Sequence, residues 1–585
     1  MAEPMRALGA ETVCEAFQLT VADHPDLTAL RMPGGEWELS WSEYGERVRR
    51  TAAGLSALGV GAGDVVATML TNRPEFHWVD TAAMHLGAIG VSIYNTFPVT
   101  QVEHLLRDCE CGTVVTESQF LPAILSARQG APALRQVIVV DGDGSEGMTL
   151  EELEGLGRPG FPFEETWRSV GADDVLTLIY TSGTTGPPKG VQLTHRNMMS
   201  MVRMWEEFVP TPGPGARIPS YLPMAHVAER EFSHYQAIPR AATVTTIADH
   251  NQIIAALPDV RPTAFLAVPR VWEKLKAGLE AGFGAAPAEE RERFERAVAA
   301  GVSRVRLELA GDPVDPELAA ETEADEEQVF APLRAALGFD QLEGAIAGAA
   351  PTPPEVLEFF FAIGIPIYEV WGMSETSALV TANPLERPKI GTVGVPLPGA
   401  EVRLAEDGEV LVRAPNVMLG YLNAPAETER AIDPDGWLRT GDIGELDDEG
   451  YLRIVDRKKE LIINAAGKNM SPTNIEARIR SASPLIAQAV AIGDRRPYNV
   501  ALVTLEPDAL AGRDEDDPAL REEILDAVAR ANEQLARVEQ IKRVKVLPGE
   551  WLPGGDELTP TLKPKRKVIA EKYSAEIEEL YEADS

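Results

Sequence analysis

Short apolar runs alternate with segments of helical periodicity through the first half of the chain. The runs at 64–70, 89–94, 113–117 and 136–141 are rich in Val, Ile and Thr, which favours buried strands. Residues 76–88, between the first two runs, predict a helix. Alternation of strands and helices at this spacing is typical of an α/β fold with largely parallel sheets.

The pattern changes twice further along the chain. Residues 283–336 are rich in Ala, Glu and Arg and predict exposed helices that break near Gly311-Asp312-Pro313, with a solvated insertion favoured over a regulatory element. From 395 to 454 short strands alternate with turns, and the Asp-Gly and Glu-Gly sequences at 406–408 and 447–450 predict hairpins. The second region therefore predicts a β-rich subdomain.

A smaller mixed α/β unit follows Asp456. It combines strand-like runs such as 488–494 and 500–507 with an acidic helical stretch after Arg513. A chain of 585 residues is too long for one hydrophobic core. We therefore expect a large N-terminal domain over residues 1–455 and a small C-terminal domain over residues 456–585.

Charge and composition exclude several classes of function. Asp and Glu number 91 against 54 Lys and Arg, a formal net charge of −37, which disfavours nucleic acid as a partner and weakens docking on anionic lipid. The first ten residues carry no secretory signal, and no apolar run reaches the roughly 18 residues of a spanning helix. Three cysteines predict no disulfide framework. We expect a cytoplasmic protein with at most weak peripheral contact with a membrane.

The strongest local motif lies between two predicted strands, at 178–191. Its glycines allow backbone amides to approach an anion, its four hydroxyl groups can donate hydrogen bonds, and its lysine adds positive charge. It is not a Walker A loop, because Lys189 is followed by Gly190 rather than by Ser or Thr. The pattern predicts a phosphate-binding loop made of Thr181, Ser182, Gly183, Thr184, Thr185, Gly186 and Lys189.

The sequence IYTSGTTGPPKG within this loop resembles the signature of the adenylate-forming family, which includes acyl-CoA synthetases, luciferases and peptide-synthetase adenylation domains. Further motifs of that family follow in order, so the resemblance extends from about residue 37 to 570. It implies the fold of that family, in which the small C-terminal domain is mobile.

The resemblance implies a nucleotide site in the large domain. His226, in Tyr221–Arg230, would line the acyl site. Trp371 would stack on adenine, although tyrosine is commoner at that position, and Ser374 would reach the α-phosphate. Thr181 and Glu375 would bind Mg²⁺, and Asp442 would accept the ribose hydroxyls. The same nucleotide site would include Gly348, Ala349, Ala350, Pro351, Gly372, Met373 and Ile454.

The resemblance also assigns roles around the C-terminal domain. Arg457 would contact the nucleotide, and Lys459 falls at the position of the hinge residue. Gly467 and Lys468 would line the channel for coenzyme A, and Lys563 would be the catalytic lysine. Only 13 lysines occur in the whole chain, and four of them, Lys189, Lys459, Lys468 and Lys563, lie in these motifs.

The activity implied is ATP-dependent conversion of a fatty acid to acyl-AMP and pyrophosphate, followed by transfer of the acyl group to coenzyme A. The segments 268–274 and 557–563 resemble the long-chain fatty acyl-CoA synthetase branch. The cofactors would be ATP, Mg²⁺ and coenzyme A, and a homodimer fits this branch although no residue pattern specifies one. Three alternatives remain: an acyl-AMP ligase that loads a carrier protein, a luciferase-like monooxygenase, and a nucleotide-binding pseudoenzyme.

Overall fold

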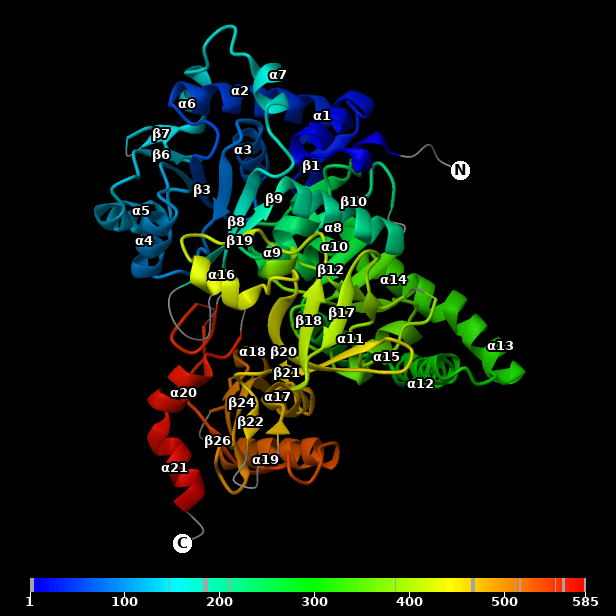
Figure 1. Cartoon of the computed structure of the whole chain (residues 1–585). Helices are drawn as coiled ribbons and strands as arrows, with labels where there is room; N and C mark the ends of the chain where they lie inside the picture. Colours follow the sequence, from blue (N-terminus) through cyan, green and yellow to red (C-terminus); the bar gives the residue numbers. More distant parts are fainter. Residues whose placement is uncertain are drawn as a thin grey trace.

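The computed structural model of the chain places a large mixed α/β domain beside a small C-terminal domain, whose elements gather at one end of the molecule (Figure 1). Within the described part, the strands form six sheets. The structure describes residues 5–145, 147–181, 188–209, 212–384, 386–463, 469–510, 512–514, 517–552, 554–559 and 563–582.

The largest sheet has eight strands and confirms the predicted α/β pattern. Its order is β19 (Gly420–Tyr421), β9 (Lys189–Thr194), β8 (Val175–Thr181), β4 (Ile89–Ser92), β3 (Val65–Met69), β5 (Thr113–Thr116), β6 (Gln136–Val139) and β7 (Met148–Thr149). From β8 to β7 all neighbouring strands are parallel, whereas β8–β9 and β9–β19 are antiparallel. The predicted strands at 64–70, 89–94, 113–117 and 136–141 are therefore correct.

Helices cover both faces of this sheet. Along β3, Val66 packs into one hydrophobic cluster with helices α2 (Trp41–Ala57) and α3 (Pro74–His85). Its neighbours Val65 and Ala67 pack into another cluster with α4 (Val99–Asp108) and α5 (Leu121–Ala127). Successive strand residues point to opposite faces, so burial on both faces explains why these strands are continuously apolar.

Two further sheets of the large domain carry segments used below. One has the order β12 (Ala264–Ala267), β13 (Gly344–Ala347), β14 (Ile367–Trp371), β15 (Thr381–Ala382) and β16 (Val395–Pro396). The other has the order β10 (Arg217–Ser220), β11 (Thr243–Thr246), β1 (Thr28–Arg31) and β2 (Glu38–Ser40). In both sheets the first three strands are parallel.

The Ala-, Glu- and Arg-rich region is helical, as predicted. After α11 (Pro269–Gly284), the helices are α12 (Ala288–Ala310), α13 (Pro316–Asp325), the π-helical η6 (Glu326–Phe330) and α14 (Ala331–Leu337). The predicted break is found where Gly311 adopts a φ of +73° after α12. The helices pack through Phe294 and Ala297 near α15 (Pro354–Ala362), at one side of the large domain in Figure 1.

The predicted hairpins form an antiparallel sheet. Its order is β17 (Glu401–Leu404), β18 (Glu409–Arg413), β20 (Leu438–Leu446) and β21 (Leu452–Arg457). Gly408 and Gly450, in the turns between strands, have φ values of +82° and +85°. Glycine tolerates this left-handed region, so the hairpin prediction is confirmed.

The C-terminal domain contains the pair β22 (Ile462–Ile463) and β23 (Asn469–Met470), and a sheet of β24 (Ile486–Ile492), β25 (Asn499–Leu505) and β26 (Ile541–Val546). Its helices include α17 (Pro472–Ser481), α19 (Pro518–Glu533), α20 (Arg566–Lys572) and α21 (Ser574–Glu582). Two hydrophobic clusters contain only described residues from Ile462 onward. The residues of the other four clusters all lie at or before Ile454. A boundary at 455/456 stays a prediction, and it would fall inside β21.

Among the described residues, no helix combines the length and the apolar character needed to cross a lipid bilayer. Cys14, Cys109 and Cys111 are all buried, and none of the three forms a disulfide.

Candidate active site

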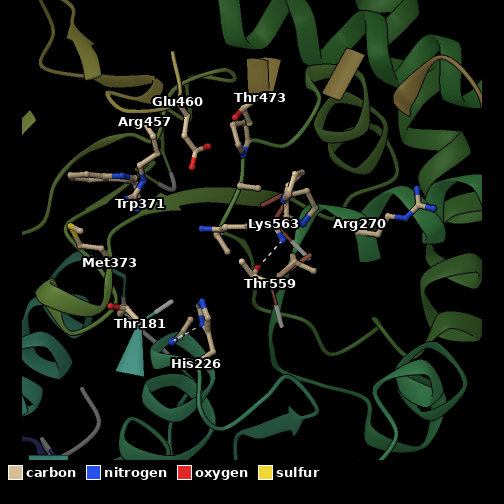
Figure 2. Close-up of a pocket in the computed structure, with 18 of the residues that line it drawn as sticks. Thr181, His226, Arg270, Trp371, Met373, Arg457, Glu460, Thr473, Thr559 and Lys563 are labelled. Atoms are coloured by element: carbon tan, nitrogen blue, oxygen red, sulfur yellow. Dashed lines mark hydrogen bonds between the residues drawn. The ribbon is translucent and has the colours of Figure 1, made fainter. Parts of the chain in front are cut away.

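A cavity of about 2550 Å³ lies where the large domain meets the C-terminal domain. Figure 2 shows side chains of both domains around it, among them His226, Trp371 and Lys563. The residues predicted from sequence that line it are Thr181, Lys189, His226, Gly348, Ala349, Ala350, Pro351, Trp371, Gly372, Met373, Ser374, Glu375, Asp442, Ile454, Arg457, Lys459 and Lys563. Ser182, Gly183, Thr184, Thr185, Gly186, Gly467 and Lys468 lie outside the described residues.

The two ends of the predicted phosphate loop are fixed by a strand pair. Thr181 ends β8, Lys189 begins β9, and the two residues pair directly across the antiparallel ladder. The Lys189 Nζ lies 2.7 Å from an Oε2 of Glu427 on helix α16 (Pro425–Ala431) and 5.3 Å from the ring centre of Tyr421. The ladder thus brings the lysine to the cavity, where its charge is paired with a carboxylate.

Trp371, Asp442 and Arg457 form one connected group. The indole Nε1–H of Trp371 donates a hydrogen bond of 2.9 Å to Oδ2 of Asp442, and Arg457 Nε lies 2.7 Å from Oδ1. Trp371 and Asp442 are buried, at the end of β14 and within β20. Because each carboxylate oxygen has two lone pairs, both oxygens can still accept further hydrogen bonds.

The backbone around Trp371 needs glycine. A Cβ on Gly372 would lie 2.0 Å from the carbonyl oxygen of Ala378, so only glycine fits this close approach. Across the neighbouring strand, Ala349 after β13 adopts a φ of +70°, an uncommon conformation for a residue with a side chain. Strained backbone of this kind persists where the surrounding structure imposes it and is frequent at ligand sites.

Glu375 lies in the single turn η7 (Ser374–Thr376) that follows this glycine. Its Oε1 accepts a hydrogen bond of 2.7 Å from the Tyr421 hydroxyl, and the described residues donate none to Oε2. The carboxylate is buried and borders the cavity. One oxygen is therefore held in place while the other can still bind a cation or a donor.

Lys563 enters the cavity from the C-terminal domain. Its backbone N–H donates to Thr559 Oγ1 at 3.0 Å (Figure 2), and the Thr559 N–H donates to the Lys563 carbonyl at 2.9 Å. The side chain is exposed to solvent within the cavity, and the neighbouring protein atoms remove part of its hydration. This desolvation, followed by the charge of Arg457, lowers the pKa of the amino group, whereas Asp442 and Glu460 raise it.

His226 lies on the other side of the cavity. It is the N-cap of α9 (Val227–Glu229), where its Nδ1 accepts from the Ala228 N–H at 3.2 Å. Burial, followed by the charge of Lys563, lowers the pKa of His226 to about 4. The imidazole is therefore neutral near pH 7, with Nδ1 as acceptor and Nε2 as donor.

Beyond His226 the cavity is bordered mainly by apolar side chains. Leu70, Phe76 and Met224 form a small hydrophobic cluster at this wall. Ile93, Trp205, Val227 and Phe232 border the same cavity. An apolar region beside a polar one suits a ligand with a hydrocarbon part and a charged part.

Ion pairs join the two domains beside the cavity. Arg270, on α11 of the large domain, pairs with Glu506 after β25, and Lys274 lies 4.0 Å from the same carboxylate. Arg478 on α17 lies 3.2 Å from Glu355 on α15. These pairs hold the C-terminal domain in the orientation that places Lys563 in the cavity.

Sequence comparison identifies the family. The profile described as AMP-binding enzyme matches residues 17–422, and the profile described as AMP-binding enzyme C-terminal domain matches residues 459–585. The chain belongs to the AMP-binding enzyme family.

Named relatives within the AMP-binding family are similar over most of the chain. One relative is FadD11 of Mycobacterium tuberculosis (strain ATCC 25618 / H37Rv), which is named a putative fatty-acid–CoA ligase. It is 50% identical to this chain over 437 residues, which cover 72% of this chain and 76% of FadD11. The long-chain-fatty-acid–CoA ligase FadD15 of the same strain is 37% identical over 96% of this chain and 95% of its own length.

Two solved structures share the fold of this chain. The anthranilate CoA ligase AuaEII, in complex with anthranoyl-AMP, aligns with a TM-score of 0.74 at 18% identity and covers 96% of this chain and 98% of its own. The adenylation domain of a carboxylate reductase from Mycobacterium chelonae aligns with a TM-score of 0.77 at 21% identity, over 98% and 93%. The expected acyl-CoA synthetase and luciferase-like fold is thus correct.

Several polar residues around this cavity could not be recognised as site residues from the sequence. Tyr421 and Glu427 are distant along the chain from Glu375 and Lys189, which they contact. Asp456 accepts hydrogen bonds from Ser471 at 2.6 Å and from the Thr473 N–H at 3.1 Å, so it ties β21 to the start of α17. The only signal in the sequence was the position of Asp456 next to Arg457 and close to the predicted hinge residue Lys459.

Glu369 on β14 also lines the cavity and should make the stability of the chain depend on pH. Burial raises its pKa from 4.5 to about 7, although its Oε1 accepts from the Thr352 N–H at 3.0 Å. Between these two values the folded chain keeps a proton that the unfolded chain releases, so stability falls as pH rises through this window.

Glu369→Gln removes this titration. Thermal unfolding from about pH 5 to 8 should show a larger loss of Tm for the native chain than for the variant. Parallel profiles would contradict this assignment.

Proposed function

We propose that the chain is an AMP-forming fatty-acid–CoA ligase, which activates a fatty acid with ATP and transfers the acyl group to coenzyme A. The observation that carries the proposal is the shared cavity, where an apolar region, a buried Trp–Asp pair and Lys563 meet. The similarity to FadD15 over nearly the whole chain supports a long acyl chain.

In the first step a fatty-acid carboxylate oxygen would attack the α-phosphorus of ATP. The bond from that phosphorus to the bridging oxygen breaks, pyrophosphate leaves, and a mixed anhydride of the acid and AMP forms. Negative charge gathers around the α-phosphate, so positioning and electrostatic stabilisation supply most of the catalysis. Lys563 would bridge the carboxylate and the α-phosphate, since a compact ammonium on a long stem suits that role.

The loop from Thr181 to Lys189 would bind the β- and γ-phosphates. Lys189 is paired with Glu427 across 2.7 Å, so phosphate binding would have to share or displace that carboxylate. Asp442 would accept the ribose hydroxyls with its remaining lone pairs. Trp371 would pack against the adenine, and its indole N–H anchors Asp442. This double role accounts for tryptophan where tyrosine is commoner.

The residues fit a magnesium ion. Mg²⁺ is usually held by one or two carboxylates together with substrate phosphates, and Glu375 has one oxygen held by Tyr421 and the other directed to no donor among the described residues. Glu375, with the Thr181 hydroxyl, would hold the ion, which when bound neutralises charge on the phosphates.

In the second step the coenzyme A thiolate would attack the acyl carbon, and AMP would leave as the carbon–oxygen bond breaks. We infer that the part of the C-terminal domain after Lys459 turns about this residue between the steps, which withdraws Lys563 and brings Gly467 and Lys468 to the acyl group. Lys459 is exposed in the turn between β21 and β22, a position where a few residues can absorb such a rotation. His226, neutral near pH 7, would orient the carboxyl group in both steps.

Measuring AMP and acyl-CoA together tests the proposal. With ATP, Mg²⁺, coenzyme A and saturated acids from short to very long, we expect one AMP per acyl-CoA, with the highest kcat/KM for long chains. AMP release without consumption of coenzyme A would indicate transfer to a carrier protein instead. Binding of ATP without release of AMP for any acid would indicate a pseudoenzyme.

Both substrates would be met in the cytoplasm, and a net charge of −37 keeps contact with anionic membranes weak. A homodimer, which fits the branch that the sequence resembles, stays a prediction.

Arg270→Ala should slow acyl-AMP formation by about three- to ten-fold while leaving thioester formation from supplied acyl-AMP unchanged. The substitution removes the pair with Glu506, which contributes only in the orientation that places Lys563 in the cavity. Single-turnover rates of the two half-reactions measure the effect. Lys276→Ala is the matched control, because Lys276 pairs with Glu280 within the same helix. An equal loss in both half-reactions would show that Arg270 acts on folding instead.

A further inference from the structure

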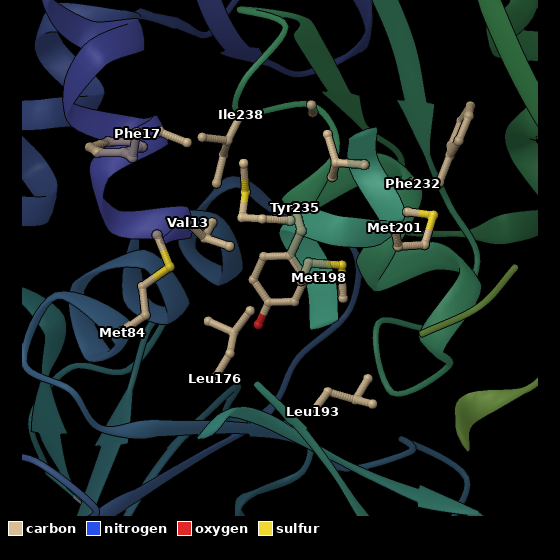
Figure 3. Close-up of a cluster of buried hydrophobic side chains, with 14 of the residues drawn as sticks. Val13, Phe17, Met84, Leu176, Leu193, Met198, Met201, Phe232, Tyr235 and Ile238 are labelled. Carbon is tan, nitrogen blue, oxygen red and sulfur yellow. The ribbon is translucent and has the colours of Figure 1, made fainter. Parts of the chain in front are cut away.

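The wall of the cavity beyond His226 is built by an unusual helix. After α9, the chain forms the π-helical segment η4 (Arg230–Tyr235). Tyr235 packs into the hydrophobic core beside Met198 and Leu176 (Figure 3), whereas Glu231 and Phe232 border the cavity. π-Helical turns often occur at functional sites, where they redirect a side chain.

Glu231 is a buried acid, and one of its two carboxyl oxygens has no hydrogen-bond partner among the described residues. Glu231 is only 2% exposed, and the oxygen without a partner is its Oε1. Gln236, which is 3% exposed, borders the same part of the cavity. Burial raises the pKa of Glu231 to about 8, although the charge of Arg240 and the Gln236 side chain oppose this rise. Near pH 7 the carboxyl group is therefore mostly protonated and can both donate and accept a hydrogen bond.

The neighbouring charged groups are bonded to other residues. Arg240 lies 2.9 Å from Glu206 and donates to the Gln236 carbonyl at 3.1 Å. Arg230, the residue before Glu231, is paired with Asp80 and donates to Ser92 at 2.6 Å. Among the described residues no ion pair includes Glu231, and this residue borders the cavity together with the apolar residues Trp205, Val227 and Phe232.

A buried polar atom without a partner is costly, so native proteins retain one mainly where water or a ligand satisfies it. A plain hydrocarbon chain cannot do so. We propose that the acid activated by this chain carries an oxygen function on its acyl chain, a hydroxyl or keto group, that hydrogen-bonds Glu231 and Gln236. This inference rests on the proposed function and concerns the substrate class of the same site.

The inference is tested by comparing two saturated acids of equal length, one unsubstituted and one with a single hydroxyl group on its chain. The quantity compared is kcat/KM for pyrophosphate release. Moving the hydroxyl along the chain locates the position that reaches Glu231. Sites built to bond a substrate hydroxyl reject the analogue that lacks it strongly, so we expect a preference of about ten-fold or more at one position.

Variants assign this preference to the two residues. Glu231→Leu should abolish it and leave activation of the unsubstituted acid equal or faster, which also reports that the variant is folded. Glu231→Gln keeps the shape and the hydrogen-bonding capacity and should retain the preference. Gln236→Leu should reduce it.

Equal kcat/KM for the two acids in the native chain, at every hydroxyl position, would overturn the inference and leave the proposed function intact, with water as the partner of Glu231. A preference that Glu231→Leu leaves unchanged would also overturn it. Activation of neither acid would overturn the proposed function and, with it, this inference.

Discussion

Lys563→Ala should lower the rate of acyl-AMP formation by about 10²- to 10³-fold, the usual effect of removing one group that stabilises developing charge. Lys563 is one of the C-terminal-domain residues that line the cavity, and it is close enough to Arg457 and Asp442 for their charges to affect its pKa. The rate of thioester formation from supplied acyl-AMP should stay within about three-fold of the native rate. The bond between the acid and the α-phosphate already exists in acyl-AMP, and this lysine would have left the site. Rapid quench of each half-reaction measures both rates.

Two nearby lysines are the matched controls. Lys565 Nζ donates to the Gly555 carbonyl at 2.7 Å, and Lys567 lies on the exposed face of α20, 4.0 Å from Glu571. Lys565→Ala and Lys567→Ala should leave acyl-AMP formation nearly unchanged. If the large loss followed Lys565 instead, or if Lys563→Ala slowed both half-reactions equally, Lys563 would not be the adenylating residue.

Much of the fold could be predicted from the sequence because local patterns determine it. The buried strands of the main sheet are continuous runs of Val, Ile and Thr, and the hairpin turns carry glycine where φ is positive. Such signals act over a few residues, so each strand or turn can be recognised alone. The order of strands in the sheet, with β9 and β19 added antiparallel at one edge, depends on packing between distant segments and could not be predicted this way.

The site residues could likewise be predicted where a local motif contains them, but not where they depend on pairing between distant segments. The motifs placed Thr181, Trp371, Asp442 and Lys563 around one ligand, and all four line one cavity. The hydrogen bond from Trp371 to Asp442 joins residues 71 positions apart, and the Lys189–Glu427 bond joins residues 238 apart. Pairings of this kind become visible only when the sheets are assembled.

Glu231 could not be predicted as a cavity residue from the sequence for a different reason. A glutamate in an Arg-Glu-Phe sequence reads as an ordinary surface residue, since charged side chains are seldom fully buried. Only the π-helical turn directs it inward to the cavity.

Lys459→Pro should separate the two half-reactions. The turn between β21 and β22 is held by N–H groups of three neighbours: Lys458 donates to the Gly441 carbonyl at 2.8 Å, and Glu460 and Leu461 donate to the Arg457 carbonyl at 2.9 and 3.1 Å. Among the described hydrogen bonds, none uses the N–H of Lys459, so proline removes no bond of this turn. The present orientation, with Lys563 in the cavity, should therefore persist.

Proline fixes φ near −65°, and this restriction opposes the rotation that the second step would need. We expect acyl-AMP formation within about three-fold of the native rate, and thioester formation slowed by about ten-fold or more. Lys459→Ala is the control, since it removes the same charge but leaves the backbone free, and it should keep both rates. If Lys459→Pro left the overall synthesis of acyl-CoA unchanged, rotation about this residue would not be part of the reaction. Equal losses in Lys459→Ala and Lys459→Pro would assign the effect to the lost ammonium group near Glu427 rather than to the backbone.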